Sequence, residues 1–168
     1  MRQLLHNYHR IDLKLTQWMK LRGILFLRIS IGLIFLWFGI LKFFPGLSPA
    51  EDLAVSTIRI MTFGLAGDQV ILYSLAALET LIGAGLIGNM FMRATLLLLF
   101  IQMAGTFFPV ILFPDDVFVV FPYALTLEGQ YIIKNLIIIS AGIVIGSTVR
   151  NESRVAQDHS PDKELAKG

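Results

Sequence analysis

The chain has 168 residues, of which 55% are hydrophobic and only 15% are charged, and its formal net charge is +2. Because soluble domains are ~45–50% apolar, this composition and a mean hydropathy of +0.71 favour a single membrane domain over a soluble enzyme. The chain has no cysteine, which excludes disulfides, thiol redox chemistry, iron–sulfur clusters and cysteine zinc sites carried by this chain alone.

The first predicted element is an amphipathic helix over residues 1–22 that lies on the membrane surface. Arg10 and Lys14 lie largely off its apolar face, as suits an anionic interface; the alternative is a partly ordered tail that only sets topology. His6 and His9 are three residues apart and could share a metal, but a solvated helix face is the simpler interpretation, so we predict no metal site. The apolar face consists of Leu4, Leu5, Tyr8, Ile11, Leu15, Trp18 and Met19.

Four long apolar stretches follow, and each has about the ~20 residues that a helix needs to cross a bilayer. They cover residues 23–44, 69–90, 93–113 and 130–149. The first is too long for a signal peptide and no small-residue cleavage site follows it, so we expect it to be retained. We therefore predict an all-α fold, a four-helix transmembrane bundle with the N-terminal interfacial helix and a short helix in the first outer loop.

The loops on the outer side carry two further predictions. Ser48 and Glu51 match a capping box and Pro49 suits the first helical position, which predicts a short helix over residues 49–63. The second outer loop, residues 114–129, is unusually apolar, and we expect it to pack back over the bundle as a lid.

The distribution of basic residues predicts the orientation. The two loops on one side contain Arg59 as their only basic residue, together with six carboxylates. By the positive-inside rule, both termini are expected in the cytoplasm. The polar tail, residues 150–168, is predicted to be disordered. The basic residues of the cytoplasmic side are Arg2, Arg10, Lys14, Lys20, Arg22, Arg93, Arg150, Arg154, Lys163 and Lys167.

Ionisable and amide side chains interrupt all four spans. A charge in lipid costs about 2.5–3.5 kcal/mol even on insertion scales, so such groups are expected to face protein, water or a ligand. They indicate a bundle with a polar interior. These side chains are Arg28 and Lys42 in the first span, Glu79 in the second, Gln102 in the third, and Lys134 and Asn135 in the fourth.

Glu79 is at the centre of the predicted site. It lies about ten residues from either end of its span, near the midplane, and Gln102 has nearly the same depth, so we expect a hydrogen bond between them. Lys134 is the cation closest in depth to Glu79, and Arg28 could reach it from the other side. A carboxyl there could accept a proton; the alternative is a purely structural hydrogen bond.

Each of the other polar groups has an alternative interpretation that needs no ligand. Lys42 and Arg28 could extend to the head groups, and Gln102 and Asn135 could act as structural polar contacts between helices. Glu128 could only complement the dipole of the fourth helix. Small residues predict where helices pack closely: Ala76, Thr80, Ala84 and Gly88 in the second span, and Gly142 and Gly146 in the fourth.

Two patterns resemble the DoxX-like family of small four-helix membrane proteins. The opening signature of that family is similar to Arg28-x-x-x-Gly32…Phe38-Gly39-x-x-Lys42. The start of its last helix, including the branch related to the YkgB proteins, is similar to Glu128-Gly129-Gln130-Tyr131-x-x-Lys134-Asn135-Leu136. Glu79 in a Gly-rich second helix fits as well, and the resemblance covers residues 23–150.

The resemblance implies a function in redox processes. One branch of the family is named for a subunit of a thiosulfate–quinone oxidoreductase, and others are linked to oxidative-stress defence in bacteria. It therefore implies an accessory subunit in the bacterial plasma membrane, with no covalent cofactor, rather than a stand-alone enzyme. The residues at matching positions are Arg28, Lys42, Glu79, Glu128, Lys134 and Asn135.

In this hypothesis Lys134, Asn135 and Lys42 bind the oxygen-rich head group of a quinone or a small anion, while Glu79 and Gln102 manage a proton. Two alternatives remain open: a small proton-coupled transporter that works as a homo-oligomer, and a non-catalytic scaffold that docks a larger partner. Besides the lipid bilayer, we expect a redox-complex partner or a second copy of the chain, and no nucleic acid.

Overall fold

The computed structural model describes residues 2–44, 46–48 and 50–158, with side chains described over residues 11–149 of these ranges. Four helical segments within it are long and apolar enough to cross a membrane: Ile11–Leu41, Asp68–Gly88, Met92–Leu112 and Leu127–Val149. The predictions of a mostly helical fold and of a multi-pass membrane protein are therefore confirmed.

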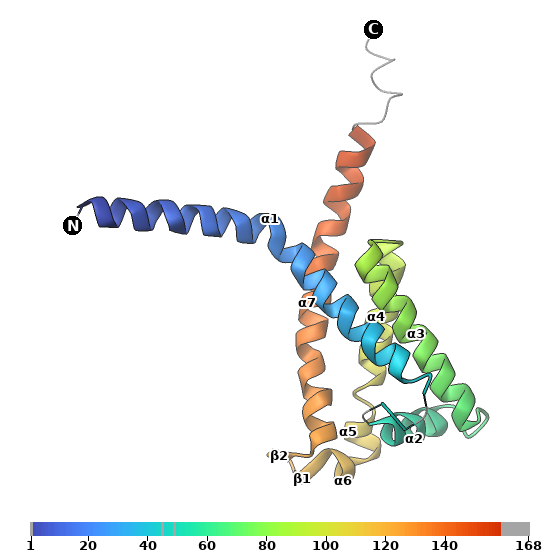
Figure 1. The fold of residues 1–168 in the computed structure, drawn as a ribbon. Helices are drawn as coiled ribbons and strands as arrows, with labels where there is room; N and C mark the ends of the chain where they lie inside the picture. Colours follow the sequence, from blue (N-terminus) through green and yellow to red (C-terminus); the bar gives the residue numbers. More distant parts are fainter. Residues whose placement is uncertain (1, 45, 49, 159–168) are drawn as a thin grey trace.

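The first helix, α1 (Arg2–Leu41), joins two elements that the sequence separated. We expected an interfacial helix over residues 1–22 and a span from residue 23, but one helix covers both and bends along its length (Figure 1). No proline lies between its ends, and a single glycine such as Gly23 costs a helix only about 1 kcal/mol, so nothing in the sequence stops it.

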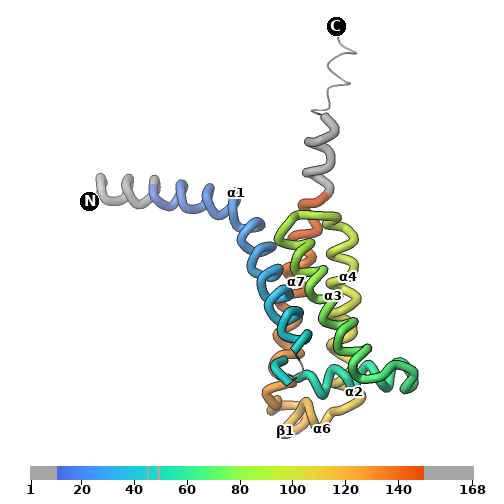
Figure 2. Tube along the Cα trace, turned by 45° about the vertical axis from the view of Figure 1, so that its right-hand side comes forward, coloured from blue at the N-terminus to red at the C-terminus, as the bar shows by residue number. Residues whose placement is uncertain are grey.

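Four helices form the bundle: α1, α3 (Asp68–Gly88), α4 (Met92–Gly105) and α7 (Leu127–Asp158). They contact one another in the cyclic order α1, α3, α4, α7 (Figure 2). Each helix buries an apolar stripe in the centre and leaves large apolar side chains exposed on its other face, as lipid contact requires. The central cluster includes Ile31, Phe35, Ile82, Leu86, Leu96, Leu99, Ala141 and Ile145.

Helices α1 and α3 approach closely where glycines face each other. A Cβ atom on Gly83 would lie 2.5 Å from the backbone nitrogen of Leu36, and one on Gly32 would lie 2.7 Å from Ile87. In the predicted small-residue ladder, Ala76 is fully buried, but Ala84 and Gly88 are exposed. Strict steps of four residues drift around a helix of 3.6 residues per turn, so Gly83 takes the place of Ala84 on the face that meets α1.

The remaining elements lie together at one end of the bundle, the loop end, and the N-terminal part of α1 and the C-terminal part of α7 leave the bundle at the opposite end (Figure 1). Helix α2 (Glu51–Met61) begins two residues after the start expected from the sequence. Its N-cap is Ala50, without a side-chain cap, so the capping-box prediction for Ser48 is wrong. The Glu51 carboxylate instead accepts a hydrogen bond from the backbone nitrogen of Gly46 at 3.1 Å.

The third span consists of two helices. The predicted span 93–113 is divided into α4 and α5 (Pro109–Leu112), and α4 ends at Gly105, four residues before the proline. Proline has no N–H, and its ring clashes with the carbonyl at the i−4 position, which explains the break.

The second loop is only partly a lid. It contains α6 (Pro114–Val117) and a two-stranded antiparallel hairpin, β1 (Phe118–Val120) and β2 (Ala124–Leu125), which the all-α prediction missed. Val117 is fully buried, but Tyr123 at the hairpin tip is 86% exposed, so the base packs on the bundle and the tip does not.

Helix α7 extends beyond its membrane span. It continues past Val149 to Asp158, so residues 150–158, predicted as the start of a disordered tail, are helical. The helical pattern has no proline before residue 161 to end it. The rest of the predicted tail, residues 159–168, lies outside the described residues.

Candidate functional site

A polar network of Lys42, Glu79 and Gln102 joins three helices of the bundle. The Lys42 ammonium donates a hydrogen bond to Glu79 Oε2 at 2.7 Å, and Gln102 Nε2 donates one to Glu79 Oε1, also at 2.7 Å. Both oxygens of the carboxylate are therefore paired. The predicted hydrogen bond between Glu79 and Gln102 is confirmed.

The network is shielded from the surface of the bundle. Lys42 is 7% exposed, Glu79 9% and Gln102 7%. An ion pair at this degree of burial gains strong Coulomb attraction, but it must overcome the cost of desolvating both groups. The amide of Gln102 helps because it supplies the second donor that the carboxylate needs.

Gly39 explains why the end of α1 can reach Glu79. A Cβ atom at this position would lie 2.7 Å from the backbone nitrogen of Thr80 and 3.0 Å from Cβ of Glu79. Only a glycine lets the backbone of α1 lie against α3 at this level. Lys42 follows in the turn immediately after Leu41, the last residue of α1, and its side chain can then turn back toward the carboxylate.

Two buried oxygens beside the ion pair have no hydrogen-bond partner within the described part of the chain. They are Gln102 Oε1 and Thr80 Oγ1. A buried acceptor without a donor costs about 1–3 kcal/mol. Gln102 Oε1 therefore keeps an unused acceptor position next to the ion pair.

The structure does not bring Lys134 to this network. Lys134 is exposed, and its ammonium lies 5.7 Å from the centre of the Tyr131 ring, within cation–π range. The expectation that Lys134 serves Glu79 is wrong, and Lys42 takes this role. Adjacent helical residues point about 100° apart, so the inward position of Asn135 directs Lys134 outward.

Asn135 and Arg28 lie apart from the network. Asn135 is half-buried and its Nδ2 donates to Thr106 Oγ1 at 3.0 Å, which ties α7 to the end of α4 as a structural contact. Arg28 is half-buried in α1, and its Nε has no partner among the described residues. Gly39 is the part of α1 that meets Glu79, and positions 28 and 39 are separated by ~16 Å along the helix axis, so Arg28 does not reach Glu79.

Glu128 belongs to a different feature, an acidic pocket of about 620 Å³ at the loop end. It lies in the first turn of α7, where a carboxylate also complements the helix dipole. Across the described residues, no three acidic or histidine side chains converge as a metal site would require. The five carboxylates that line the pocket are Glu51, Asp52, Asp115, Asp116 and Glu128.

Sequence reasoning identified Lys42, Glu79 and Gln102 as candidates, but it paired Glu79 with Lys134 and not with Lys42. The available signal was Gly39, because small residues in membrane helices let neighbouring backbones approach closely, and Lys42 is one turn away from it. Known proteins supply no further guide: no protein-family model, curated protein or solved structure matches this chain.

Proposed function

We propose that this chain is a DoxX-like accessory subunit of a membrane redox or oxidative-stress system, and that the Lys42–Glu79–Gln102 network binds a quinone or a small anion. The observation that carries the proposal is a paired lysine and glutamate, each less than a tenth exposed, in a helix bundle of membrane-spanning length. Buried ionisable groups in membrane spans are expensive and usually serve ligand or proton pathways.

The donors and acceptors of the network suit an oxygen-rich ligand. The Lys42 ammonium carries three N–H donors, of which one binds Glu79, so two can donate to a carbonyl oxygen or an anion. Gln102 Oε1 can accept a hydrogen bond from a quinol hydroxyl. Glu79, held between them, is the group that would exchange a proton with such a ligand.

We also propose that the protein lies in the plasma membrane of a bacterium, with both termini in the cytoplasm. The support is the charge difference between the two ends of the bundle. The loop end carries the acidic pocket, whereas Arg22 and Arg93 are found toward the opposite end. The positive-inside rule assigns that opposite end to the cytoplasm.

The test is the binding of a short-chain ubiquinone analogue, and separately of thiosulfate, to protein extracted with its native lipids. Wild-type protein should bind one of the two. Lys42→Met should weaken binding roughly tenfold or more, as expected when a charged hydrogen-bond donor is lost, and Glu79→Gln should weaken it as well. Lys134→Met is the matched control, because it removes an exposed lysine from the same bundle.

Three results would contradict the proposal. Unchanged binding in Lys42→Met and Glu79→Gln would separate the network from the ligand. Equal losses in Lys42→Met and Lys134→Met would indicate a general charge effect. Proton movement across liposomes that depends on a solute and requires Glu79 would instead establish the transporter alternative.

A further inference from the structure

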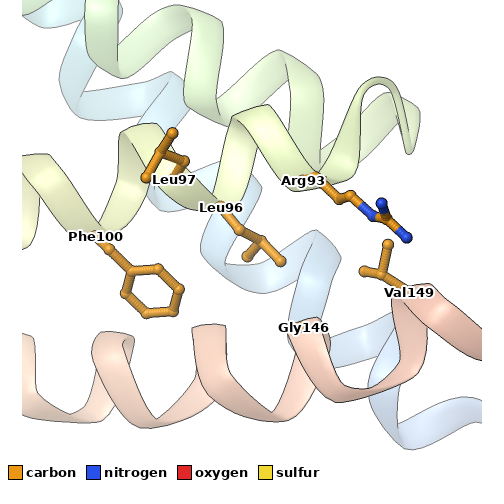
Figure 3. Close-up of a pocket in the computed structure, with 6 residues that line it drawn as sticks. All are labelled: Arg93, Leu96, Leu97, Phe100, Gly146 and Val149. Atoms are coloured by element: carbon orange, nitrogen blue, oxygen red, sulfur yellow. The ribbon is translucent and has the colours of Figure 1, made fainter.

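A groove of about 410 Å³ runs between α4 and α7, and no residue of the network lines it. Leu96, Leu97 and Phe100 of α4 form one wall, and Gly146 and Val149 of α7 form the other. Arg93, in the first turn of α4, lies at one end of the groove, and its guanidinium extends toward Val149 (Figure 3).

The two glycines of α7 explain why the groove opens at the Arg93 end. A Cβ atom on Gly142 would lie 3.1 Å from the ring of Phe100, which is tight packing. A Cβ atom on Gly146 would meet only Leu96, at an ordinary 3.4 Å. The helices are therefore in close contact at Gly142 and leave free space one turn later, at Gly146.

The lining of the groove combines an apolar channel with one permanent cation. Arginine stays charged at any physiological pH and binds phosphate oxygens in a bidentate manner. From Arg93 to Phe100 the groove follows α4 for ~10 Å, because a helix rises ~1.5 Å per residue. An apolar channel of this length below an arginine matches the upper part of an acyl chain that is attached to a phosphate.

We propose that this groove binds one anionic phospholipid, with its phosphate at Arg93 and one acyl chain along Leu96, Leu97 and Phe100. Arg93 begins a segment of membrane-spanning length, Met92–Leu112, so it lies at the depth where lipid phosphates are found. Basic pockets between membrane helices are a known form of head-group recognition. This site shares no residue with the Lys42–Glu79–Gln102 network, so it stands independently of the proposed function.

The experiment is native mass spectrometry of the full chain titrated with dioleoyl phosphatidylglycerol or with dioleoyl phosphatidylcholine. Wild-type protein should retain one phosphatidylglycerol in preference to phosphatidylcholine. Arg93→Gln should weaken phosphatidylglycerol binding about fivefold, which corresponds to ~1 kcal/mol for one basic residue at an anionic surface. Arg22→Gln is the matched control, since it removes an exposed arginine near the same end of the bundle and should change binding little.

A second variant tests the apolar part of the site. Gly146→Leu places a side chain into the groove and should reduce retention of both lipids, whereas Gly146→Ala adds only a methyl group at ordinary contact distance and should retain the preference. Equal effects of Arg93→Gln and Arg22→Gln, or equal retention of the two lipids, would overturn the proposal. Complete competition by inorganic phosphate would also overturn it, because the groove would then be a site for free anions. A dimer without bound lipid, in which Leu97 of one copy covers the groove of the other, would overturn it as well.

Discussion

Lys42 and Glu79 are 37 positions apart in the chain, yet the ammonium of one lies 2.7 Å from the carboxylate of the other. A lysine near the end of a membrane helix usually extends toward the head groups. Lys42 turns back into the bundle instead, because Gly39 brings the end of α1 against α3 at this level. The pair therefore fixes the position of α1 relative to α3, in addition to any role with a ligand.

Removing one partner of this pair should be costly. Lys42→Met leaves the Glu79 carboxylate in the bundle without its cation, and breaking a buried pair in this way costs about 3–5 kcal/mol. The free energy of unfolding in mixed micelles measures the loss. Lys134→Met removes only an exposed cation–π contact with Tyr131, so it should change this free energy by no more than about 1 kcal/mol.

The double variant Lys42→Met/Glu79→Gln completes this test. With both charges removed, no unpaired ion remains in the bundle, so it should be more stable than Lys42→Met alone. If Lys42→Met were as stable as Lys134→Met, the ion pair of Lys42 and Glu79 would make no net contribution to the free energy of unfolding.

A second ion pair, which is exposed, offers a comparison with the buried pair of Lys42 and Glu79. Arg59 of α2 pairs with Asp68 of α3, and their side chains are 49% and 56% exposed. Exposed pairs contribute only about 0–1 kcal/mol and are screened by salt. In a double-mutant cycle with Arg59→Gln and Asp68→Asn, we expect a coupling within that range that decreases between low and high salt. A coupling as large as that of Lys42 with Glu79 would contradict the exposure argument.

The contact between α1 and α3 predicts a large effect of one methyl group. Gly83→Ala would place its Cβ 2.5 Å from the backbone of Leu36, so the helices must separate. We expect destabilisation of about 1–3 kcal/mol, the usual range for overpacking, measured as a lower unfolding free energy. Gly105→Ala is the control, because nothing lies within 4 Å of the added atom, and alanine there should be neutral or favourable. Equal effects at both positions would mean that the two backbones do not meet at Gly83.

The depth of a residue could be predicted from the sequence, but its direction often could not. Counting along each span placed Glu79 and Gln102 at one level, and the hydrogen bond between them followed. Lys134 and Asn135 are adjacent, so at most one of them can point fully inward, and their identities alone favour neither. The direction is decided by packing against α4, where Asn135 finds Thr106.

Helix ends and short strands were the other features that the sequence pattern missed. The hairpin strands β1 and β2 are three and two residues long, too short to show an alternating pattern. The continuous α1 was missed for a different reason. The change from an amphipathic to a fully apolar pattern near residue 23 marks entry into a new environment, and it was interpreted as a break in the helix.

The contact between Asn135 and Thr106 should contribute modestly to stability. Hydrogen bonds between membrane helices average about 0.6 kcal/mol in double-mutant cycles, because the unfolded chain in the membrane also finds partners. The variants Asn135→Ala, Thr106→Val and their combination should give a coupling near that value in unfolding free energy. A coupling of zero would indicate that the two side chains do not interact, and Ser140→Ala, on an exposed part of α7, controls for effects of the helix itself.

The proposed orientation can be tested without removing any native thiol, because the chain contains no cysteine. Tyr123 at the hairpin tip is 86% exposed, and Met90 between α3 and α4, at the opposite end of the bundle, is 58% exposed. A membrane-impermeant maleimide should label Tyr123→Cys in spheroplasts with intact membranes, and it should label Met90→Cys only after permeabilisation.

The lipid-facing surface supplies the control for this experiment. Leu81 is 64% exposed, but it lies within the α3 span. Maleimides react with the thiolate, which requires water, so Leu81→Cys should stay unlabelled in both preparations. Labelling of Met90→Cys in intact spheroplasts, with Tyr123→Cys protected, would place both termini outside the cytoplasm. Labelling of Leu81→Cys would show that this face of α3 contacts water. Leu81 would then line a water-filled path and would not face the lipid.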